Sequence, residues 1–451
     1  MEKQLKNCHD NIINIIMNIV KMKNKMGKFK KKSSQLIDFV LNDLDIFNLL
    51  KGCDVVIDSK KGVFFALKKK ILADLKDADT FAKNQFENKI IERVVEEIKN
   101  PGDLPNMHFI SNSTYGDKKS IDFIKKNARG VVTYKFTDGR RKYSFSFIIF
   151  DEKFRKLDTF DLHAYKVVMW LYMASQYAGD SCAETLNISL FFADVEKMKP
   201  SSPLDILSAE NCNTAVTTSC TKEGIIFLYR EEEWFKVLIH ESFHIFGLDF
   251  SYQFSHVLNQ RMSEVFPIQS TWNIFECYTE FWAEILNVMF VSYFVIDADN
   301  LSVDFDTFSN YVGFLFEIER CFSIFQVSKI LDFMGLKLMD LHHKNTKENA
   351  SKKYLYRENT NVFSYYILKM ILFFNCDETL EWFEKHNQNI LKFSSKRKDV
   401  EDFGDFLIKK FVDPSLHRTM LAMYKKYPQV TSLASEFTNN TLRMTAVELV
   451  Q

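Results

Sequence analysis

The chain has 451 residues with 59 basic and 59 acidic side chains, so its formal net charge at neutral pH is zero. This balance gives no support to a general role in binding nucleic acid or an anionic membrane surface. Hydrophobic residues make up 46% of the chain, which is typical of a globular protein and, at this length, predicts two to four folding units.

The first half of the chain alternates helical and strand patterns. Residues 1–50 read as a helical arm that becomes strongly basic. A hairpin is predicted around the S-K-K-G turn at 59–62, and a helix at 80–99. Two alternating apolar runs at 131–150 flank an Asp-Gly pair, which predicts a second hairpin.

The pattern then changes from mixed to almost wholly helical. A helix at 158–178 is followed by strands at 186–195 and 224–230. The next helix, 231–248, opens with three acids and closes at Gly247, as helix ends prefer. Further helices are predicted at 253–265, 271–296, 305–334, 360–375, 378–392, 397–411 and 415–426.

This order predicts an α+β fold with a small mixed sheet, followed by a helical C-terminal part. We expect a helical, basic arm at 1–50 and an α+β domain with β-hairpins at 51–180. A metal-binding core is expected at 181–300, an all-α subdomain at 301–430 and a tail at 431–451.

Cysteine spacing and the length of apolar runs indicate in which cellular compartment the protein is expected. The eight cysteines are irregularly spaced without a C-x-x-C motif, which indicates free thiols in a reducing environment. The N-terminal region lacks a secretory signal pattern, and the apolar stretch at 285–297 is shorter than the ~20 residues of a membrane span. We expect an intracellular, cytoplasmic protein. The composition, rich in Lys, Asn and Ile, is typical of AT-rich coding, as in a parasite or a large virus, and a viral protein would be virion-associated.

The sequence H-E-x-x-H at 240–244 is the strongest chemical signal. On a helix, His240 and His244 lie on one face and can present imidazole nitrogens to one ion. Zn²⁺ prefers such ligands and leaves a position open in catalytic sites. Glu241, next to the first histidine, could act as the general base on a water molecule at the metal.

The third ligand is predicted in an acidic row on the later helix 271–296. Glu276, Glu280 and Glu284 repeat every four residues in apolar surroundings, with no basic residue near them in sequence. Such a row is costly to bury unless a cation faces it. Asp249 lies one position too early for the ligand of an H-E-x-x-H-x-x-G-x-x-H/D motif but could hydrogen-bond a histidine.

"HESFH" followed by "FECYTEFWAE" resembles the gluzincin group of zinc metallopeptidases. The resemblance implies a zincin-like core in which Glu276 is the third zinc ligand and Glu280 hydrogen-bonds a zinc-bound histidine. Phe275 and Cys277 depart from the residues the family often has there. An alternative register stays open, in which Glu280 is the third ligand and Glu284 is the acid that hydrogen-bonds a zinc-bound histidine.

The resemblance also implies how substrate would bind. In zincins an edge strand pairs with the peptide, and residues 224–230 resemble that strand by position. An oxyanion donor usually comes from the C-terminal helical part, where Arg357, Tyr365 and Tyr366 are candidates and Arg357 and Tyr366 are the residues we select.

We therefore expect a zinc-dependent peptidase with a peptide or protein substrate. Two His and one carboxylate can also hold non-haem iron, but the glutamate of the motif favours zinc hydrolysis. The alternative is a structural or virion-associated interaction protein on a zincin-derived fold, with a non-catalytic metal site. The oligomeric state and the substrate's identity do not follow from the sequence.

Overall fold

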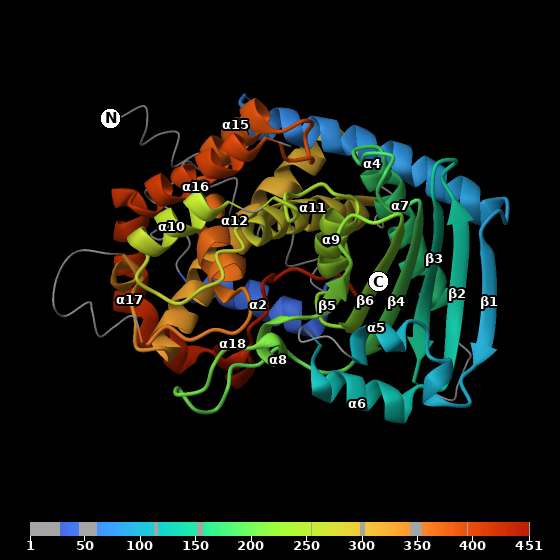
Figure 1. Cartoon of the computed structure of the whole chain (residues 1–451), viewed down its shortest axis with the longest axis horizontal. Coiled ribbons are helices and arrows are strands. Elements are labelled where there is room, and N and C mark those ends of the chain that lie inside the picture. Colours follow the sequence, from blue (N-terminus) through green and yellow to red (C-terminus); the bar gives the residue numbers. More distant parts are fainter. Residues whose placement is uncertain are drawn as a thin grey trace.

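A computed structural model of the chain contains one six-stranded mixed sheet. The sheet lies along one side of the molecule (Figure 1). The structure describes residues 28–44, 61–111, 116–150, 157–253, 255–297, 303–342, 354–394 and 396–450. The strand order is β1-β2-β3-β4-β6-β5, with β3, β4 and β6 parallel and the other pairs antiparallel. The strands are β1 (Glu92–Glu97), β2 (Gly130–Thr137), β3 (Lys142–Ile149), β4 (Thr185–Ala193), β5 (Ala215–Thr217) and β6 (Glu223–Arg230).

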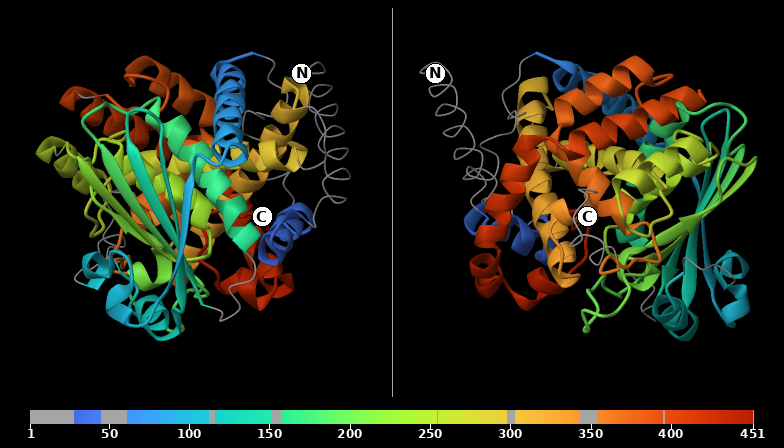
Figure 2. Two further views of the ribbon diagram at one scale, coloured as in Figure 1. Left: turned by 90° about the vertical axis from the view of Figure 1, so that its right-hand side faces the viewer. Right: turned by 60° about the vertical axis from the view of Figure 1, so that its left-hand side comes forward.

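Helices cover both faces of this sheet and continue into a large helical body (Figures 1 and 2). Alternation along β6 explains the two faces, because Ile226 and Leu228 join the main core while Phe227 and Tyr229 join a smaller one. The smaller core is covered by α5 and α6, and the main core by α7 and α9. The principal helices are α2 (Lys31–Asn42), α4 (Val63–Glu87), α5 (Met107–Ser111), α6 (Lys118–Asn127), α7 (Leu157–Ser175), α9 (Trp234–Ile245), α10 (His256–Val265), α11 (Phe275–Asp297), α12 (Phe305–Phe333), α14 (Lys369–Phe374), α15 (Cys376–His386), α16 (Arg397–Phe411) and α17 (Pro414–Leu433); shorter ones are α8 (Ala209–Cys212), α18 (Glu436–Asn440) and the π-helix η5 (Phe363–Leu368).

The predicted α+β class is confirmed, as is the hairpin at 131–150. In the hairpin, β2 and β3 pair from Gly130 opposite Ile149 to Thr137 opposite Lys142. Gly139 in the connecting turn has a φ of 91°, a conformation that glycine adopts without strain. The Asp138 carboxylate accepts the backbone N–H groups of Arg140 and Arg141, which closes the turn.

The hairpin predicted around 59–62 is wrong. Residues from Val63 onward form the helix α4, whose buried Phe64, Leu67, Ile71 and Leu75 follow a helical spacing. The stretch at 51–60 lies outside the described residues. The predicted helix at 80–99 ends early as well, because α4 stops at Glu87 and β1 follows.

Two predicted domain boundaries are also wrong. The boundary at 180/181 separates β3 from β4, but these strands pair in one sheet and share one apolar core. Residues 431–451 are no detached tail, because Leu442, Met444, Ala446 and Val447 are buried. Backbone N–H groups of this C-terminal segment donate to the buried carboxylates of Glu233 and Glu319. Most of the predicted basic arm, residues 1–27 and 45–50, lies outside the described residues.

Helix α11 runs through the middle of the helical body. It is the one helix in the described part of the chain that is long and apolar enough to cross a membrane. In its most apolar window, 94% of the residues are buried inside the protein. The hydropathy of α11 is therefore explained by its place in the core.

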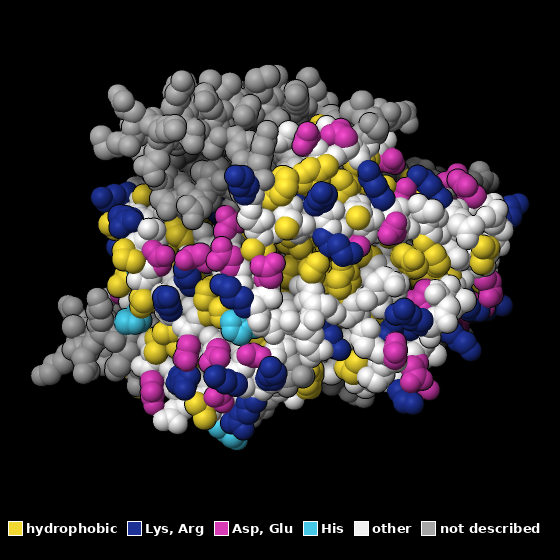
Figure 3. Space-filling model, turned by 90° about the horizontal axis from the view of Figure 1, so that it is seen from above, with side chains coloured by type: hydrophobic (Ala, Val, Ile, Leu, Met, Phe, Trp, Pro, Cys, Tyr) yellow, Lys and Arg dark blue, Asp and Glu magenta, His cyan; other side chains and the backbone are white. Residues whose placement is uncertain are grey.

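Cysteine pairing departs from the expectation of free thiols. Cys182 and Cys220 form a disulfide, so the prediction is wrong for this pair. The other cysteines that the structure describes are buried and form no disulfide with one another: Cys212, Cys277, Cys321 and Cys376. On the face of the molecule seen in Figure 3, basic and acidic side chains are interspersed, in keeping with the zero net charge.

Candidate metal centre

Helix α9 carries the H-E-x-x-H residues and is buried along its whole length. It follows β6 directly and begins after Glu233, whose φ is 60°. Gly247, two residues past the helix end at Ile245, has a φ of 61°, and the Leu248 N–H donates to the Phe243 carbonyl. This is the glycine-terminated helix end that the sequence predicts at Gly247.

Three side chains converge between α9 and α11. His240 Nε2 lies 3.2 Å from Glu276 Oε2 and 3.2 Å from His244 Nε2, and His244 Nε2 lies 3.4 Å from Glu276 Oε2. Tetrahedral zinc bonds of about 2.05 Å place neighbouring ligand atoms about 3.3 Å apart. The spacing of the three atoms therefore matches one face of a zinc coordination tetrahedron.

The other ring nitrogens of both histidines meet carboxylates. His240 Nδ1 lies 2.8 Å from Glu280 Oε2, and His244 Nδ1 lies 2.6 Å from Asp249 Oδ2. A carboxylate at Nδ1 holds the proton there, so each Nε2 keeps a free lone pair. Asp249 and Glu280 thus lie where the sequence predicts histidine partners. Glu276 is the acid that faces the two Nε2 atoms, which favours the first register over the alternative one.

The acidic row of α11 is matched by cations from other helices. The Lys236 amine on α9 lies 2.5 Å from Glu280 Oε1, and the Lys369 amine on α14 lies 2.7 Å from Glu284 Oε1. Among the described residues Glu276 has no lysine partner, and it accepts a hydrogen bond from Asn361 Nδ2 at 3.0 Å. Sequence reasoning missed Lys236, Lys369 and Asn361, although Lys236 lies one turn before His240 on the same helix face.

The electrostatics of this cluster favour added positive charge. Burial alone would lower the pKa of His244, but the carboxylates of Asp249 and Glu276 raise it well above its usual value. Burial would raise the pKa of Glu276, yet the two histidines lower it to about 2. The group of three side chains thus attracts a cation, either protons or a metal ion.

A cavity of about 230 Å³ opens onto these atoms. Glu241 lines it beside the histidines, is 8% exposed, and has its pKa raised by burial. The rest of the lining is uncharged and comes from β5 and the residues beside it, the loop after α9, the start of α11 with the residues before it, and η5 with the residues before it: Asn213, Ala215, Val216, Thr217, Ser219, Ser251, Asn273, Phe275, Asn361 and Tyr365.

Of the predicted oxyanion donors, the structure brings only Tyr365 to this cavity. Its ring centroid lies 5.9 Å from that of His240, and it comes from the π-helical turn η5. The Tyr366 hydroxyl donates to the Leu442 carbonyl at 2.5 Å, and the Arg357 guanidinium donates to the Pro203 carbonyl. Selecting Tyr366 and Arg357 is therefore wrong, because adjacent helical residues face different ways and Arg357 lies in a loop against Pro203.

The strand predicted to form the edge of the sheet is an interior strand. Residues 224–230 lie in β6, which is flanked by β4 on one side and β5 on the other. The edge on this side of the sheet is the three-residue strand β5, antiparallel to β6, and Ala215, Val216 and Thr217 line the cavity beside His240 and His244. So short a strand lacks the length of alternating pattern by which a sequence indicates strands.

Comparison with known proteins gives one match and two negative results. A stretch of 199 residues is 31% identical to an uncharacterized protein of Acanthamoeba polyphaga mimivirus. The match covers 42% of this chain and 46% of that protein, so the chain spans just under half of its relative's length. No protein-family model matches the chain. No solved structure matches it either.

Proposed function

We propose that this protein is a zinc-dependent metallopeptidase with Glu241 as its general base. The observation that carries the proposal is the meeting of His240 Nε2, His244 Nε2 and Glu276 Oε2 within 3.2–3.4 Å of one another. With both Nδ1 atoms bonded to carboxylates, three lone pairs face one another. Such an arrangement repels itself unless a cation lies between the atoms.

The donor set fits zinc. Two imidazole nitrogens and one carboxylate oxygen are ligands of catalytic zinc sites, which keep a further position open. Non-haem iron accepts the same donors, but a buried glutamate beside the set favours hydrolysis. When bound, zinc would supply Lewis acidity toward a water molecule and a substrate carbonyl.

The chain's own groups account for the proton transfers and the orientation of the ligands. Glu241 takes a proton from the attacking water and delivers it to the leaving nitrogen, a role suited to a carboxylate whose pKa burial raises. Tyr365 lines the same cavity, which supports it as the donor to the oxyanion of the tetrahedral intermediate. Glu280 and Asp249 hold the two imidazoles in the tautomer that frees Nε2.

The edge of the sheet supports a peptide as substrate. Strand β5 pairs with β6 on one side only, and its residues line the cavity that contains the metal-binding atoms. An extended peptide could pair antiparallel with β5 and bring one carbonyl to the site. The similarity to a mimivirus protein supports an origin in a large DNA virus, where the enzyme would act in the cytoplasm or be packaged in virions.

The test is the Glu241→Gln variant compared with wild type and with Glu264→Gln, a control at an exposed position of α10. We expect about one zinc ion per chain in all three proteins. Cleavage of a mixed peptide library should fall by roughly 10²- to 10⁴-fold in Glu241→Gln alone. Wild-type cleavage by Glu241→Gln would refute the general-base role, and absence of zinc from the wild type would refute the metal site.

A further inference from the structure

Lys166, on α7, differs from other buried lysines in its partners. Lys197, Lys236 and Lys369 each lie within 2.7 Å of a glutamate oxygen, and Lys329 donates to the carbonyls of Thr438 and Thr441. Lys166 is only 9% exposed, yet its amine has no hydrogen-bond or ion-pair partner in the described part of the chain. A buried ammonium group without such a partner is strongly disfavoured relative to the neutral amine.

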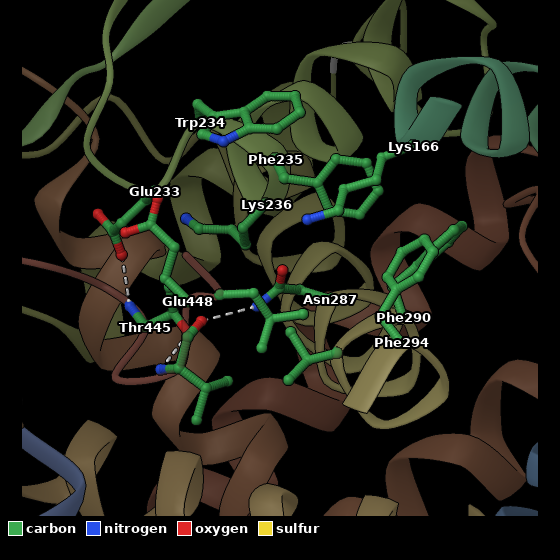
Figure 4. A pocket seen from close by; sticks show the side chains of 13 residues that line it. Lys166, Glu233, Trp234, Phe235, Lys236, Asn287, Phe290, Phe294, Thr445 and Glu448 are labelled. Atoms are coloured by element: carbon green, nitrogen blue, oxygen red, sulfur yellow. Dashed lines mark hydrogen bonds between the residues drawn. The ribbon is translucent and has the colours of Figure 1, made fainter. Parts of the chain in front are cut away.

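The Lys166 amine points into a small cavity at the start of the metal-binding helix (Figure 4). The cavity measures about 20 Å³, enough for one molecule the size of water. Phe235, Phe290 and Phe294 form much of its wall, and the amine lies 5.2 Å from the centroid of the Phe294 ring. The ring face compensates a positive charge only weakly.

The charged groups around the cavity are already paired with other residues. Glu233 lies 2.7 Å from the Lys197 amine, and Lys236 lies 2.5 Å from Glu280. Glu448 lies 2.9 Å from both the Lys30 amine and the Arg443 guanidinium. Burial therefore dominates and lowers the pKa of Lys166 to about 8, with Glu448 opposing the shift and Lys30 adding to it.

We propose that Lys166 is a covalent modification site, whose amine has no hydrogen-bond or ion-pair partner among the described residues, lines a small buried cavity and takes small carbonyl electrophiles. The inference is independent of the metal centre. Desolvated lysines in hydrophobic pockets are nucleophilic because they are neutral near physiological pH. The amine lone pair forms a C–N bond to the carbonyl carbon, and loss of water leaves an imine. A hydride donor such as cyanoborohydride then reduces the imine to a secondary amine.

The experiment is reductive methylation of the native full-length chain with limiting formaldehyde and cyanoborohydride at pH 7.5, followed by peptide mapping. At pH 7.5 a pKa near 8 gives Lys166 a neutral fraction about 200-fold larger than an ordinary lysine has. Allowing for restricted entry, we expect Lys166 to react at least about tenfold faster than Lys222, whose side chain is 75% exposed. The paired Lys197 and Lys236 should stay unlabelled.

Two controls make the result decisive. In denaturant, Lys166 and Lys222 should react at equal rates, because the difference depends on the folded cavity. The Lys166→Arg variant keeps the charge and most of the volume, and it should lose the fast phase of label uptake. A Lys166 rate no higher than that of Lys222 in the folded protein overturns the proposal, and so does a fast phase that persists in Lys166→Arg.

Discussion

Two neighbouring regions bury charge in opposite ways. Around the C-terminal segment, buried acids meet lysines or arginines, as in Glu233 with Lys197 and Glu448 with Arg443. About two turns further along α9, His240 and His244 face Glu276 at the start of α11, and with protons on both Nδ1 atoms the three side chains present only lone pairs to one another. The first region balances its own charges, whereas the second requires a cation from outside the chain. Helix α11 contains both kinds, because Glu284 pairs with Lys369 whereas Glu276 faces the two histidines.

The largest expected effect concerns the self-balanced region. Lys369→Met leaves Glu284 buried without its partner, which should lower the free energy of unfolding by about 3–5 kcal/mol. Denaturant titration of the zinc-free protein measures this change. Adding Glu284→Gln to the variant should restore much of the loss. A cost below about 1 kcal/mol for Lys369→Met would mean that the pair is not needed.

Acid should weaken the same region. Burial alone would raise the pKa of Glu233, but Lys197 and other nearby cations lower it to about 2. A depressed carboxyl pKa stabilises the fold above the unfolded value near 4.5, and this stabilisation disappears as the pH falls toward 2. The shift corresponds to about 3 kcal/mol.

Comparison of wild type with Glu233→Gln at pH 7 and pH 3 isolates this contribution. The stability difference between the two proteins should shrink by about 2 kcal/mol between pH 7 and pH 3, because the folded-state carboxyl is still largely ionised at pH 3. The exposed-site variant Glu264→Gln should follow the wild type at both pH values. If the stability difference between wild type and Glu233→Gln is the same at both pH values, the neighbouring cations do not lower the pKa of Glu233.

The third expected effect concerns the candidate metal centre of His240, His244 and Glu276. Glu276→Ala removes one of three predicted zinc ligands. Loss of a residue that only hydrogen-bonds a ligand lowers metal affinity by about 10- to 100-fold, so loss of a ligand itself should lower it by about 100-fold or more. Without zinc, the variant should be somewhat less stable than zinc-free wild type at neutral pH, because the protonated histidines lose the Glu276 carboxylate. Zinc competition with a chromogenic chelator and thermal unfolding measure the two quantities. Wild-type affinity would exclude Glu276 as a ligand.

The smallest expected effect tests the hydrogen bond behind a ligand. In Asp249→Asn the amide oxygen can still accept the His244 Nδ1 proton, but the negative charge is lost. Zinc affinity should fall by about tenfold, the lower end of the range for such partners. The same chelator competition measures it. A fall as large as that in Glu276→Ala would mean that Asp249 binds the metal itself.

Local patterns predicted much of the candidate site and the elements that carry it. The H-E-x-x-H spacing, the acid row and Gly247 all lie on or beside the helices that the sequence predicts. The hairpin at 131–150 forms as its Asp-Gly turn indicates. These features depend on neighbours within a few residues, since helix faces and tight turns are short-range geometry.

Long-range packing overrode local patterns elsewhere. Residues from Val63 onward form a helix rather than a strand, because the apolar face of α4 is covered by α7 and α12. Strand β5 exists through its pairing with β6, and Cys182 meets Cys220 across a separation of 38 residues. A single sequence carries little signal for such contacts, because they join segments that are distant along the chain.

By itself, the sequence determined the donor types, the two histidines on one helix face, the candidate base Glu241 and the α+β order of elements. Only the tertiary structure decided which acid of the row faces the histidines, which tyrosine lines the cavity and which strand forms the sheet edge. It also decided that residues 442–447 are buried, against Glu233 and Glu319. The physical reason is that residue spacing specifies which side chains share a face, whereas the packing of distant elements specifies what that face meets.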